Sequence, residues 1–301
     1  MLWEFHTRRL RADTPPERLA DRVAFSQRRP YRVVQCRKCT LVYRNPRERE
    51  FELTGTYERE VLGEEVLQSL FETQRASYEA QARRLTNVVG RTGVGLEIGS
   101  YVGGFLAAAR DHGWNFVGRD VNENANAFAR QQGLEVAHGT LEDFETRRRY
   151  RAVCIWNCLD QLPEPRRSVR LASALLENGG TLAIRVPNGG FYAGIRPLMN
   201  GFMAPVARTL LAHNNLLSFP YRTGFTVRSL RRLLEENGLI VLRTYGDALV
   251  PIADEWTKRW AKAEERGLKQ LLRLPGAAGE AGAAVSPWFE MYARRPGKQA
   301  S

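Results

Sequence analysis

The chain has 301 residues, of which 43% are hydrophobic and 26% are charged, an ordinary composition for a globular protein. No apolar run approaches the roughly 18 residues of a membrane span, and the arginine-rich N-terminus lacks the apolar core of a signal peptide. Four cysteines are too few for a disulfide framework. These features predict a cytoplasmic protein that does not associate with a membrane.

The charge balance is strongly basic, with 45 Lys and Arg against 33 Asp and Glu, a formal net charge of +12 and a pI near 9.9. Only five of the basic residues are lysines. An arginine-rich surface is one way to bind RNA. However, no basic run alternates with aromatic residues, as a base-stacking surface requires. We therefore expect the charge to reflect a preference for arginine over lysine, and nucleic acid is the less favoured partner.

The chain divides into three parts on its sequence pattern. Residues 1–50 form a short segment rich in proline and arginine, residues 51–90 have a helical pattern that predicts a helical lid, and residues 91–301 form the main domain. The predicted strands of that domain are Val94–Ile98, Asn115–Arg119, Leu134–His138, Tyr150–Asn157, Thr181–Val186, Leu239–Tyr245 and Trp288–Arg294. Because helical segments alternate with the strands, the pattern predicts an α/β fold with a doubly wound parallel sheet.

The predicted helices follow the strands in turn. They are Phe105–Arg110, Glu123–Gln132, Arg166–Glu177, Val227–Asn237 and Asp254–Leu272. Two segments break this alternation: residues 188–225, which we expect to be a long irregular insertion, and residues 276–286, which we expect to be a Gly/Ala-rich loop.

A glycine-bearing turn follows the first predicted strand. Gly99 and Gly103 let the backbone turn tightly and approach a ligand, and the next strand ends at Asp120, about 20 residues after the first glycine. A dinucleotide or S-adenosylmethionine fits this arrangement of turn and ribose-binding acid. The dinucleotide fingerprint needs a glycine where this chain has Tyr101, whose side chain obstructs a pyrophosphate. S-adenosylmethionine is therefore the favoured ligand.

Four blocks resemble, in order and spacing, the motifs of class I S-adenosylmethionine-dependent methyltransferases. They are Glu97-x-Gly99-x-x-x-Gly103, Gly118-Arg119-Asp120, Gly139–Asp143 and Trp156–Leu162, the last with Asp160-Gln161 where the family commonly has Glu-His. The similarity covers about residues 90–187. The resemblance implies a Rossmann-like methyltransferase fold with a mostly parallel seven-stranded sheet and S-adenosylmethionine as cofactor.

The resemblance also implies roles for single residues. Those matched to the cofactor are Glu97, Gly99 and Gly103 at the methionine moiety, Asp120 at the ribose, Val121 at the adenine face, Thr140 and Leu141 at the adenine edge, and Asn157 facing the cofactor. An ionised carboxylate such as Asp120 accepts hydrogen bonds from ribose hydroxyls well. Asn157 has an alternative interpretation, as a cap at the end of its strand.

The pair Cys36-x-x-Cys39 resembles half of the zinc knuckle that precedes some methyltransferases, including sugar C-methyltransferases. A structural zinc needs four ligands, and only His6 lies upstream. We therefore expect a metal-free turn, with zinc as the less favoured alternative. Cys158 follows the fourth strand, where pyrimidine C5-methylation uses a nucleophile, but no basic residue beside it activates the thiol.

The segment 188–225 follows the fifth strand and is the predicted acceptor-binding insertion, because ligands bind at the carboxyl ends of such strands. His213 is the first candidate for a general base and Tyr221 the second. A purely structural role for His213 and Asn214, as caps or partners of backbone groups, is the alternative.

The sequence thus predicts methyl transfer to a small polar acceptor, a sugar or a related metabolite, at a hydroxyl or a carbon atom. Two alternatives stay open: a non-catalytic S-adenosylmethionine-binding accessory protein, and an RNA methyltransferase. The identity of the acceptor, the atom methylated and the oligomeric state stay open as well.

Overall fold

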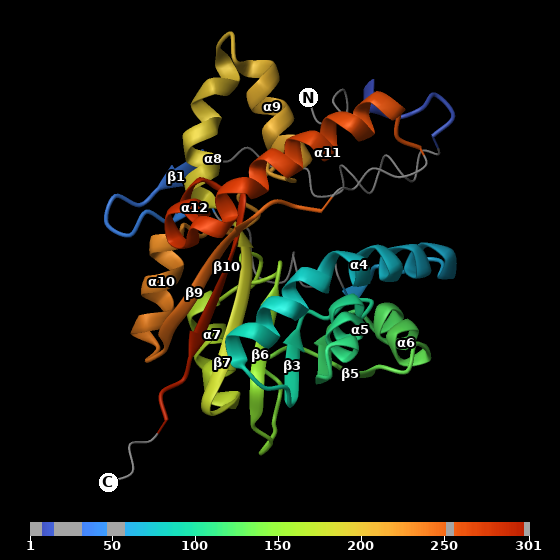
Figure 1. Cartoon of the computed structure of the whole chain (residues 1–301), viewed down its shortest axis with the longest axis vertical. Helices are drawn as coiled ribbons and strands as arrows, with labels where there is room; N and C mark the ends of the chain where they lie inside the picture. Colours follow the sequence, from blue (N-terminus) through green and yellow to red (C-terminus); the bar gives the residue numbers. More distant parts are fainter. Residues whose placement is uncertain (1–7, 15–31, 47–57, 251–255, 298–301) are drawn as a thin grey trace. The chain divides into compact units, whose positions relative to one another are not determined.

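The computed structural model describes residues 8–14, 32–46, 58–250 and 256–297 (Figure 1). His6, residues 51–57 of the expected lid and the first two residues of the helix expected from Asp254 lie outside these ranges. Two compact units make up the chain. Unit 1 consists of residues 1–47, 187–229 and 244–290, and unit 2 consists of residues 48–186, 230–243 and 291–301.

A seven-stranded sheet is the framework of the fold, in the order β5-β4-β3-β6-β7-β10-β9. Its strands are β3 (Val94–Ile98), β4 (Asn115–Asp120), β5 (Glu135–His138), β6 (Tyr150–Trp156), β7 (Leu176–Pro187), β9 (Ile240–Asp247) and β10 (Trp288–Arg294). Strand β3 pairs in parallel with β4 and with β6, β4 pairs in parallel with β5, and β6 does so with β7. The predicted doubly wound, mostly parallel sheet of seven strands is confirmed.

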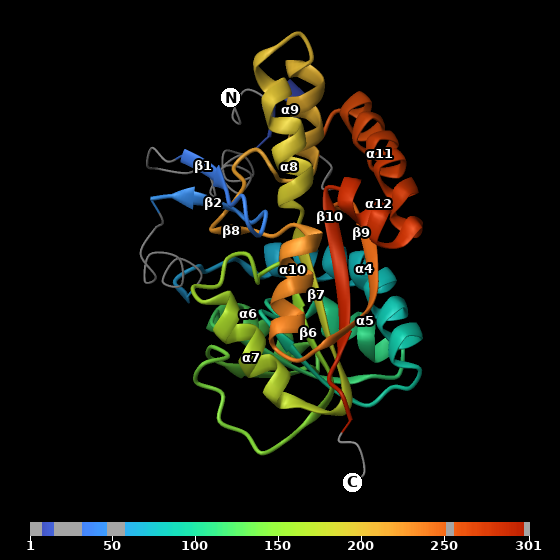
Figure 2. The same cartoon turned by 90° about the vertical axis from the view of Figure 1, so that its left-hand side faces the viewer.

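Helices cover both faces of the part of the sheet that belongs to unit 2. Figures 1 and 2 show α4 and α5 on one face and α7 and α10 on the other. The helices are α4 (Glu64–Val89), α5 (Gly104–Asp111), α6 (Glu123–Gln131), α7 (Pro165–Leu175) and α10 (Val227–Glu236). Phe105 of α5 is fully buried and its ring makes edge contacts with Tyr78, Phe116 and Trp156. This aromatic cluster joins α4 and α5 to strands β4 and β6.

Unit 1 has a small sheet of its own, in the order β1-β2-β8. Its elements are β1 (Arg32–Gln35), β2 (Val42–Asn45), β8 (Thr223–Gly224), α8 (Gly189–Ile195), α9 (Ala204–His213), α11 (Arg259–Arg273), α12 (Gly279–Val285) and 3-10 turns at Arg196–Asn200 and Leu274–Ala278. Figure 2 shows α8 and α9 lying side by side. A buried apolar cluster of Val42, Tyr192, Leu211, Leu216 and Phe219 packs β2 against the helical segment 189–219.

Three local predictions are wrong. Residues 188–225 contain α8, α9 and β8 rather than irregular chain, and residues 276–286 contain α12 rather than a loop. Their glycines and prolines suggested loops, but the apolar side chains of Tyr192 and Leu211 are buried when the first segment is helical, and alanine favours helix in the second.

The third error is the start of β7. The sequence Asn178-Gly179-Gly180 suggested the end of a helix, yet α7 stops at Leu175 and the strand begins at Leu176. The N–H of Gly179 donates to the carbonyl of Arg295, and the N–H of Arg295 donates to the carbonyl of Gly180. This pairing with a residue far along the chain holds the glycines extended, and no local pattern reports it.

Asn188 fixes the turn that leads out of β7. It is 1% exposed, its Oδ1 accepts from the N–H of Gly190, and its Nδ2 donates to the carbonyl oxygens of Ala283, Ala284 and Ser286. One side chain thus caps α8 and shares its two N–H donors among carbonyls at the end of α12.

We expect Asn188→Ala to lower the free energy of unfolding by about 3 kcal/mol, because buried polar groups lose their partners. Urea denaturation of the full chain measures this loss. The control is Asn200→Ala at an exposed position of the same unit, which should stay within about 0.5 kcal/mol of the wild type. Equal stabilities for the two variants would contradict the assigned role of Asn188.

Candidate cofactor site and general-base candidates

The loop between β3 and α5 is held in a left-handed conformation. Gly99, Tyr101 and Gly103 have φ angles of 75°, 47° and 80°. A Cβ atom on Gly99 would lie 2.8 Å from the sulfur of Cys158, and one on Gly103 would lie 2.5 Å from a methyl carbon of Leu134. Glycine is therefore required at both positions by conformation and by space, as the turn motif predicts.

Asp120 stands at the end of β4 and binds this loop. Its Oδ2 accepts from the N–H of Tyr101 at 2.8 Å and its Oδ1 accepts from the N–H of Asn122 at 2.9 Å. Burial raises the pKa of Asp120, and the N–H groups of Asn122 and Tyr101 oppose this rise. Each carboxylate oxygen has a second lone pair, so the side chain can still accept a hydrogen bond from a ligand hydroxyl.

Glu97 is the second acid of the site and has an oxygen without a partner. It is 2% exposed, and its Oε2 has no hydrogen-bond partner among the described residues. Burial, and then the charge of Asp120, raise the pKa of Glu97 well above its usual range. A buried carboxyl oxygen without a partner is costly, and a cationic or hydrogen-bond-donating ligand removes that cost. The ammonium group of S-adenosylmethionine fits this requirement.

Asn157 follows β6 and its amide is already hydrogen-bonded on both sides. Its Oδ1 accepts from Nη1 of Arg185 on β7 at 2.6 Å, and its Nδ2 donates to the hydroxyl of Tyr78 on α4 at 2.9 Å. Burial raises the pKa of Tyr78, so its hydroxyl stays protonated at neutral pH. These bonds hold the Asn157 side chain between two other side chains, and both interpretations of Asn157 remain predictions.

The residues matched to the adenine pocket differ in what they can offer. The hydroxyl of Thr140 donates to Oδ2 of Asp143 at 2.6 Å, Leu141 is buried, and the carbonyl of Val121 is 3.0 Å from Nε2 of His138. Strand β4 and the turn after β5 are adjacent, because Asp120 pairs with His138 in the sheet. Val121 and Thr140 are partly exposed, so both can face a ligand. Their roles remain predictions.

The sequence reading did not single out Tyr78, Arg185 or Asp160 as site residues. Tyr78 looked like a core position of a helix and Arg185 like one residue of an apolar strand, so only the folded arrangement shows that they meet at Asn157.

Asp160 is fully buried, and neither of its oxygens has a hydrogen-bond partner among the described residues. Burial raises the pKa of Asp160 to about 8. The sequence feature that points to Asp160 is the pair Asp160-Gln161, which stands where the family commonly has Glu-His.

Cys158 has no features of a nucleophile. Its thiol donates to the carbonyl of Ile98 at 3.3 Å. Burial, followed by the charges of Asp160, Asp120 and Glu97, raises its pKa well above the usual range. A protonated buried thiol is unreactive, in agreement with the sequence interpretation.

The Cys36-x-x-Cys39 pair lies in the hairpin between β1 and β2. The N–H of Thr40 donates to the carbonyl of Cys36, the N–H of Cys36 donates to the carbonyl of Leu41, and both cysteines are free and partly buried. The N–H and thiol of Cys39 lower the pKa of Cys36. Across the ranges that the structure describes, no three His, Cys, Asp or Glu side chains form a metal-binding group. Zinc is thus not supported by the described residues.

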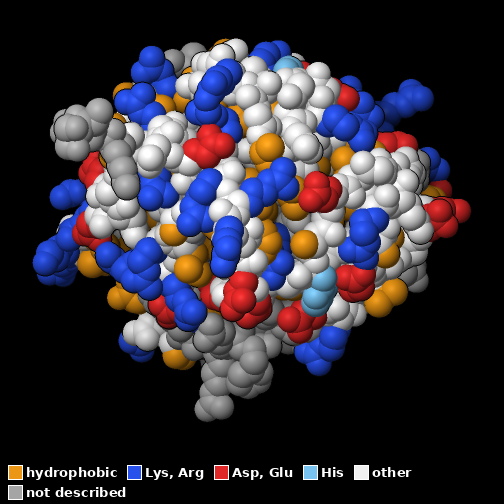
Figure 3. Space-filling view, turned by 90° about the horizontal axis from the view of Figure 1, so that it is seen from below, with side chains coloured by type: hydrophobic (Ala, Val, Ile, Leu, Met, Phe, Trp, Pro, Cys, Tyr) orange, Lys and Arg blue, Asp and Glu red, His pale blue; other side chains and the backbone are white. Residues whose placement is uncertain are grey.

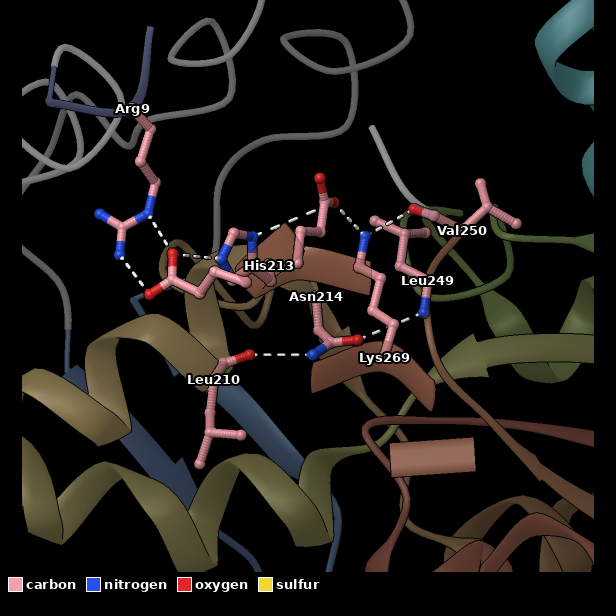
Figure 4. Close-up of polar contacts among 9 residues, drawn as sticks. Arg9, Leu210, His213, Asn214, Leu249, Val250 and Lys269 are labelled. Atoms are coloured by element: carbon pink, nitrogen blue, oxygen red, sulfur yellow. Dashed lines mark hydrogen bonds and ion pairs between the residues drawn. The ribbon is translucent and has the colours of Figure 1, made fainter. Parts of the chain in front are cut away.

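The candidate bases His213 and Tyr221 belong to unit 1, whereas the cofactor-site residues belong to unit 2. Figure 4 shows His213 at the end of α9 between two carboxylates of α11: its Nε2 is 3.3 Å from Glu264 and its Nδ1 is 4.0 Å from Glu265. The hydroxyl of Tyr221 donates to the carbonyl of Asn215 at 3.2 Å.

The groups around His213 form one buried polar network. Glu264 accepts from Nε and Nη2 of Arg9 at 3.0 and 3.1 Å, and Lys269 donates to Glu265 and to the carbonyl of Val250 (Figure 4). Asn214 donates to the carbonyl of Leu210 and accepts from the N–H of Leu249, as expected for a partner of backbone groups. Burial lowers the pKa of His213. The general-base role of either residue remains a prediction.

Comparisons with known proteins agree with the fold. Residues 71–244, more than half of the chain, match the model of a family described as methyltransferase domain. A solved S-adenosylmethionine-dependent methyltransferase from Thermotoga maritima is 15% identical, with 81% of this chain and 99% of that chain covered at a TM-score of 0.52. One from Archaeoglobus fulgidus is 15% identical, with 73% and 94% covered at 0.48. No curated protein sequence matches significantly.

The family match, together with the fold, identifies an S-adenosylmethionine-dependent methyltransferase, which confirms the predicted class and cofactor. The chain belongs to the methyltransferase domain family. No helix in the described part of the chain has the length and apolar character needed to cross a bilayer.

We expect Asp120→Asn to weaken binding of S-adenosylhomocysteine by about 1.5–3 kcal/mol, because a neutral amide replaces the charged acceptor. Isothermal titration calorimetry measures the affinity, and circular dichroism checks that the variant is folded. Asp111→Asn is the matched control: Asp111 is an exposed carboxylate of the same unit, bonded to Arg75, and its loss should leave affinity unchanged. Equal affinity of Asp120→Asn and wild type would contradict the ribose role.

A second prediction concerns pH and His213. Because burial lowers its pKa below the ordinary value of about 6.5, protonation favours the unfolded chain. The stability that neutral His213 contributes is therefore present above about pH 6.5 and is lost as the pH falls. We expect His213→Gln to reduce the difference in unfolding free energy between pH 7.5 and pH 5.5.

Urea denaturation at the two pH values tests this expectation, with His138→Gln as the control because His138 is exposed. The control should retain the wild-type pH dependence. If the unfolding free energy of His213→Gln changed with pH as much as that of the wild type, His213 would not be the source of the pH dependence.

Proposed function

We propose that the protein transfers the methyl group of S-adenosylmethionine to a small polar acceptor, a sugar or a related metabolite, at a hydroxyl or a carbon atom. The observation that carries the proposal is the pair of buried acids at the carboxyl ends of adjacent parallel strands, Glu97 on β3 and Asp120 on β4. Ligands of open α/β sheets bind at that edge. Family membership supplies the reaction class.

S-adenosylmethionine supplies an electrophilic methyl group on a positively charged sulfur. The residues proposed for it are Glu97 at the ammonium group, Asp120 at the ribose hydroxyls and the loop of Gly99 and Gly103 for close backbone approach. Val121, Thr140 and Leu141 are proposed for the adenine, and Asn157 for orientation through Tyr78 and Arg185. The protein mainly contributes the positioning of two bound reactants.

For the acceptor we propose residues 188–225, because this segment follows β7 and carries aromatic and polar side chains. His213 and Tyr221 are the proposed bases if the acceptor reacts through a hydroxyl. Residues 51–90 are proposed as a lid, supported by the bond from α4 to Asn157. The division into residues 1–50, 51–90 and 91–301 is part of the same proposal.

A small acceptor is favoured over RNA by the distribution of charge. On the face shown in Figure 3, Lys and Arg side chains are interspersed with Asp and Glu. Many arginines of unit 2 pair with acids, among them Arg75 with Asp111, Arg151 with Glu177 and Arg166 with Glu236. Arginines engaged in this way contribute less to a phosphate-binding surface.

The test measures release of S-adenosylhomocysteine from S-adenosylmethionine with a panel of sugars, sugar acids, sugar phosphates and RNA. We expect turnover with a small molecule, and we expect it to fall at least about tenfold in Asp120→Asn. Once an acceptor is found, single-turnover assays of His213→Gln and Tyr221→Phe identify the base by a loss of about a hundredfold. Turnover with RNA alone would overturn the proposal, and cofactor binding with no turnover on the whole panel would favour the accessory-protein alternative.

A further inference from the structure

Arg222 is a partly buried cationic group, and two of its three donor nitrogens lack a hydrogen-bond partner among the described residues. It lies directly before β8 in unit 1 and is partly buried, and its Nε and Nη1 are buried without a hydrogen-bond partner among the described residues. No Asp or Glu of those residues forms an ion pair with it. A guanidinium stays charged at every physiological pH, and each buried N–H without a partner costs about 1–3 kcal/mol. A bound anion would supply the missing hydrogen-bond acceptors and offset this cost.

A second arginine lies beside it. Strand β2 pairs antiparallel with β8 through Tyr43 and Thr223, so the next pair in this register is Arg44 and Arg222. Arg44 is 5% exposed and donates to the carbonyl oxygens of Pro220 and Ser218, in the loop that leads to Arg222. An anion bound at Arg222 would therefore lie beside a second guanidinium group.

Arg222 is tied to the beginning of the segment 188–225 by a backbone hydrogen bond close to it. The N–H of Gly189 donates to the carbonyl of Phe225 at 2.7 Å, so the end of β8 lies against the first turn of α8. That turn follows directly after β7 along the chain. Arg222 thus belongs to the end of the insertion that we propose for the acceptor.

We propose that Arg222 binds an acidic group, a carboxylate or a phosphate, of the methyl acceptor. The acceptor is then an anionic small molecule, such as a sugar acid or a sugar phosphate, rather than a neutral one. Arginine is suited to both groups, because its planar guanidinium presents several N–H donors to their oxygens. This inference rests on the proposed function, since it assigns the class of acceptor for that reaction.

The first experiment measures anion binding without an acceptor. Melting temperatures of the full chain are recorded with inorganic phosphate or with malonate, at an ionic strength kept constant with chloride. A ligand that binds the folded state raises the melting temperature, here by about 2–4 °C. We expect this rise in the wild type and its loss in Arg222→Gln. The control is Arg228→Gln, which removes one charge at an exposed position of the same unit and should keep the rise.

Arg222→Lys keeps the charge but not the planar donors, so it should show a reduced rise and provides a second, milder variant if Arg222→Gln does not fold. Equal shifts in the wild type, Arg222→Gln and Arg222→Lys would overturn the assignment. A rise with phosphate alone identifies a phosphate group, and a rise with malonate alone identifies a carboxylate.

The second experiment compares each acidic acceptor with a neutral counterpart in the S-adenosylhomocysteine release assay: the methyl ester of a carboxylic acid, or the dimethyl ester of a phosphate. Both are called the ester below. We expect the acid to be preferred by the wild type, and Arg222→Gln to raise KM for the acid at least about tenfold with little change for the ester. Equal turnover of acid and ester by the wild type would overturn the inference while the proposed methyl transfer stands. No turnover with any acceptor would overturn the proposed function, and the phosphate and malonate shifts would still decide whether Arg222 binds an anion.

Discussion

The carboxylate of Asp120 is the interaction on which the candidate site depends, because it joins the end of β4 to the loop after β3, which is also bonded to the carbonyl of Arg119. Its two oxygens accept from Tyr101 in the loop after β3 and from Asn122 at the start of α6. The strained left-handed turn at Tyr101 is thereby held in place, and the helices α5 and α6 begin from a common point. A residue that binds a ligand hydroxyl at this position is already rigid before the ligand arrives, which lowers the entropy lost on binding.

Burial gives the neighbourhood of Asp120 a consistent electrostatic character. The pKa values of Glu97, Asp160 and Cys158 are all raised by burial, and for Glu97 and Cys158 nearby acids raise them further. A site that disfavours additional negative charge is stabilised by a cation, and S-adenosylmethionine carries positive charge on its sulfur and its amine. The same burial and charges raise the pKa of Cys158 and so favour its protonated form.

How far the sequence predicts this structure depends on the range of the interactions involved. The strands β3, β4 and β6 and the glycine turn follow from local hydrophobicity and glycine spacing, and they appear where expected. Helix α12 and the start of β7 were missed because their conformation is set by packing or by pairing with Arg295, more than a hundred residues away. The bonds of Asn157 to Tyr78 and Arg185 could not be predicted either, because these residues are far apart in the sequence. Residue type and spacing select Asp120 as the candidate acid for the ribose, but they do not show which side chains contact it.

His213 and Arg222 show why hydrogen-bond satisfaction is a better guide to the acceptor than residue type. His213 was the natural candidate because imidazole titrates near neutral pH, yet both of its ring nitrogens face carboxylates within a network tied to Arg9 and Lys269. To act as a base, His213 would have to give up its contact with one of these carboxylates and bind the acceptor hydroxyl instead. Arg222 has no such partner to give up, so an incoming acid gains the full interaction with its N–H groups. Binding energy is available where the fold has left a polar group unsatisfied, and in unit 1 that condition holds at Arg222 rather than at His213.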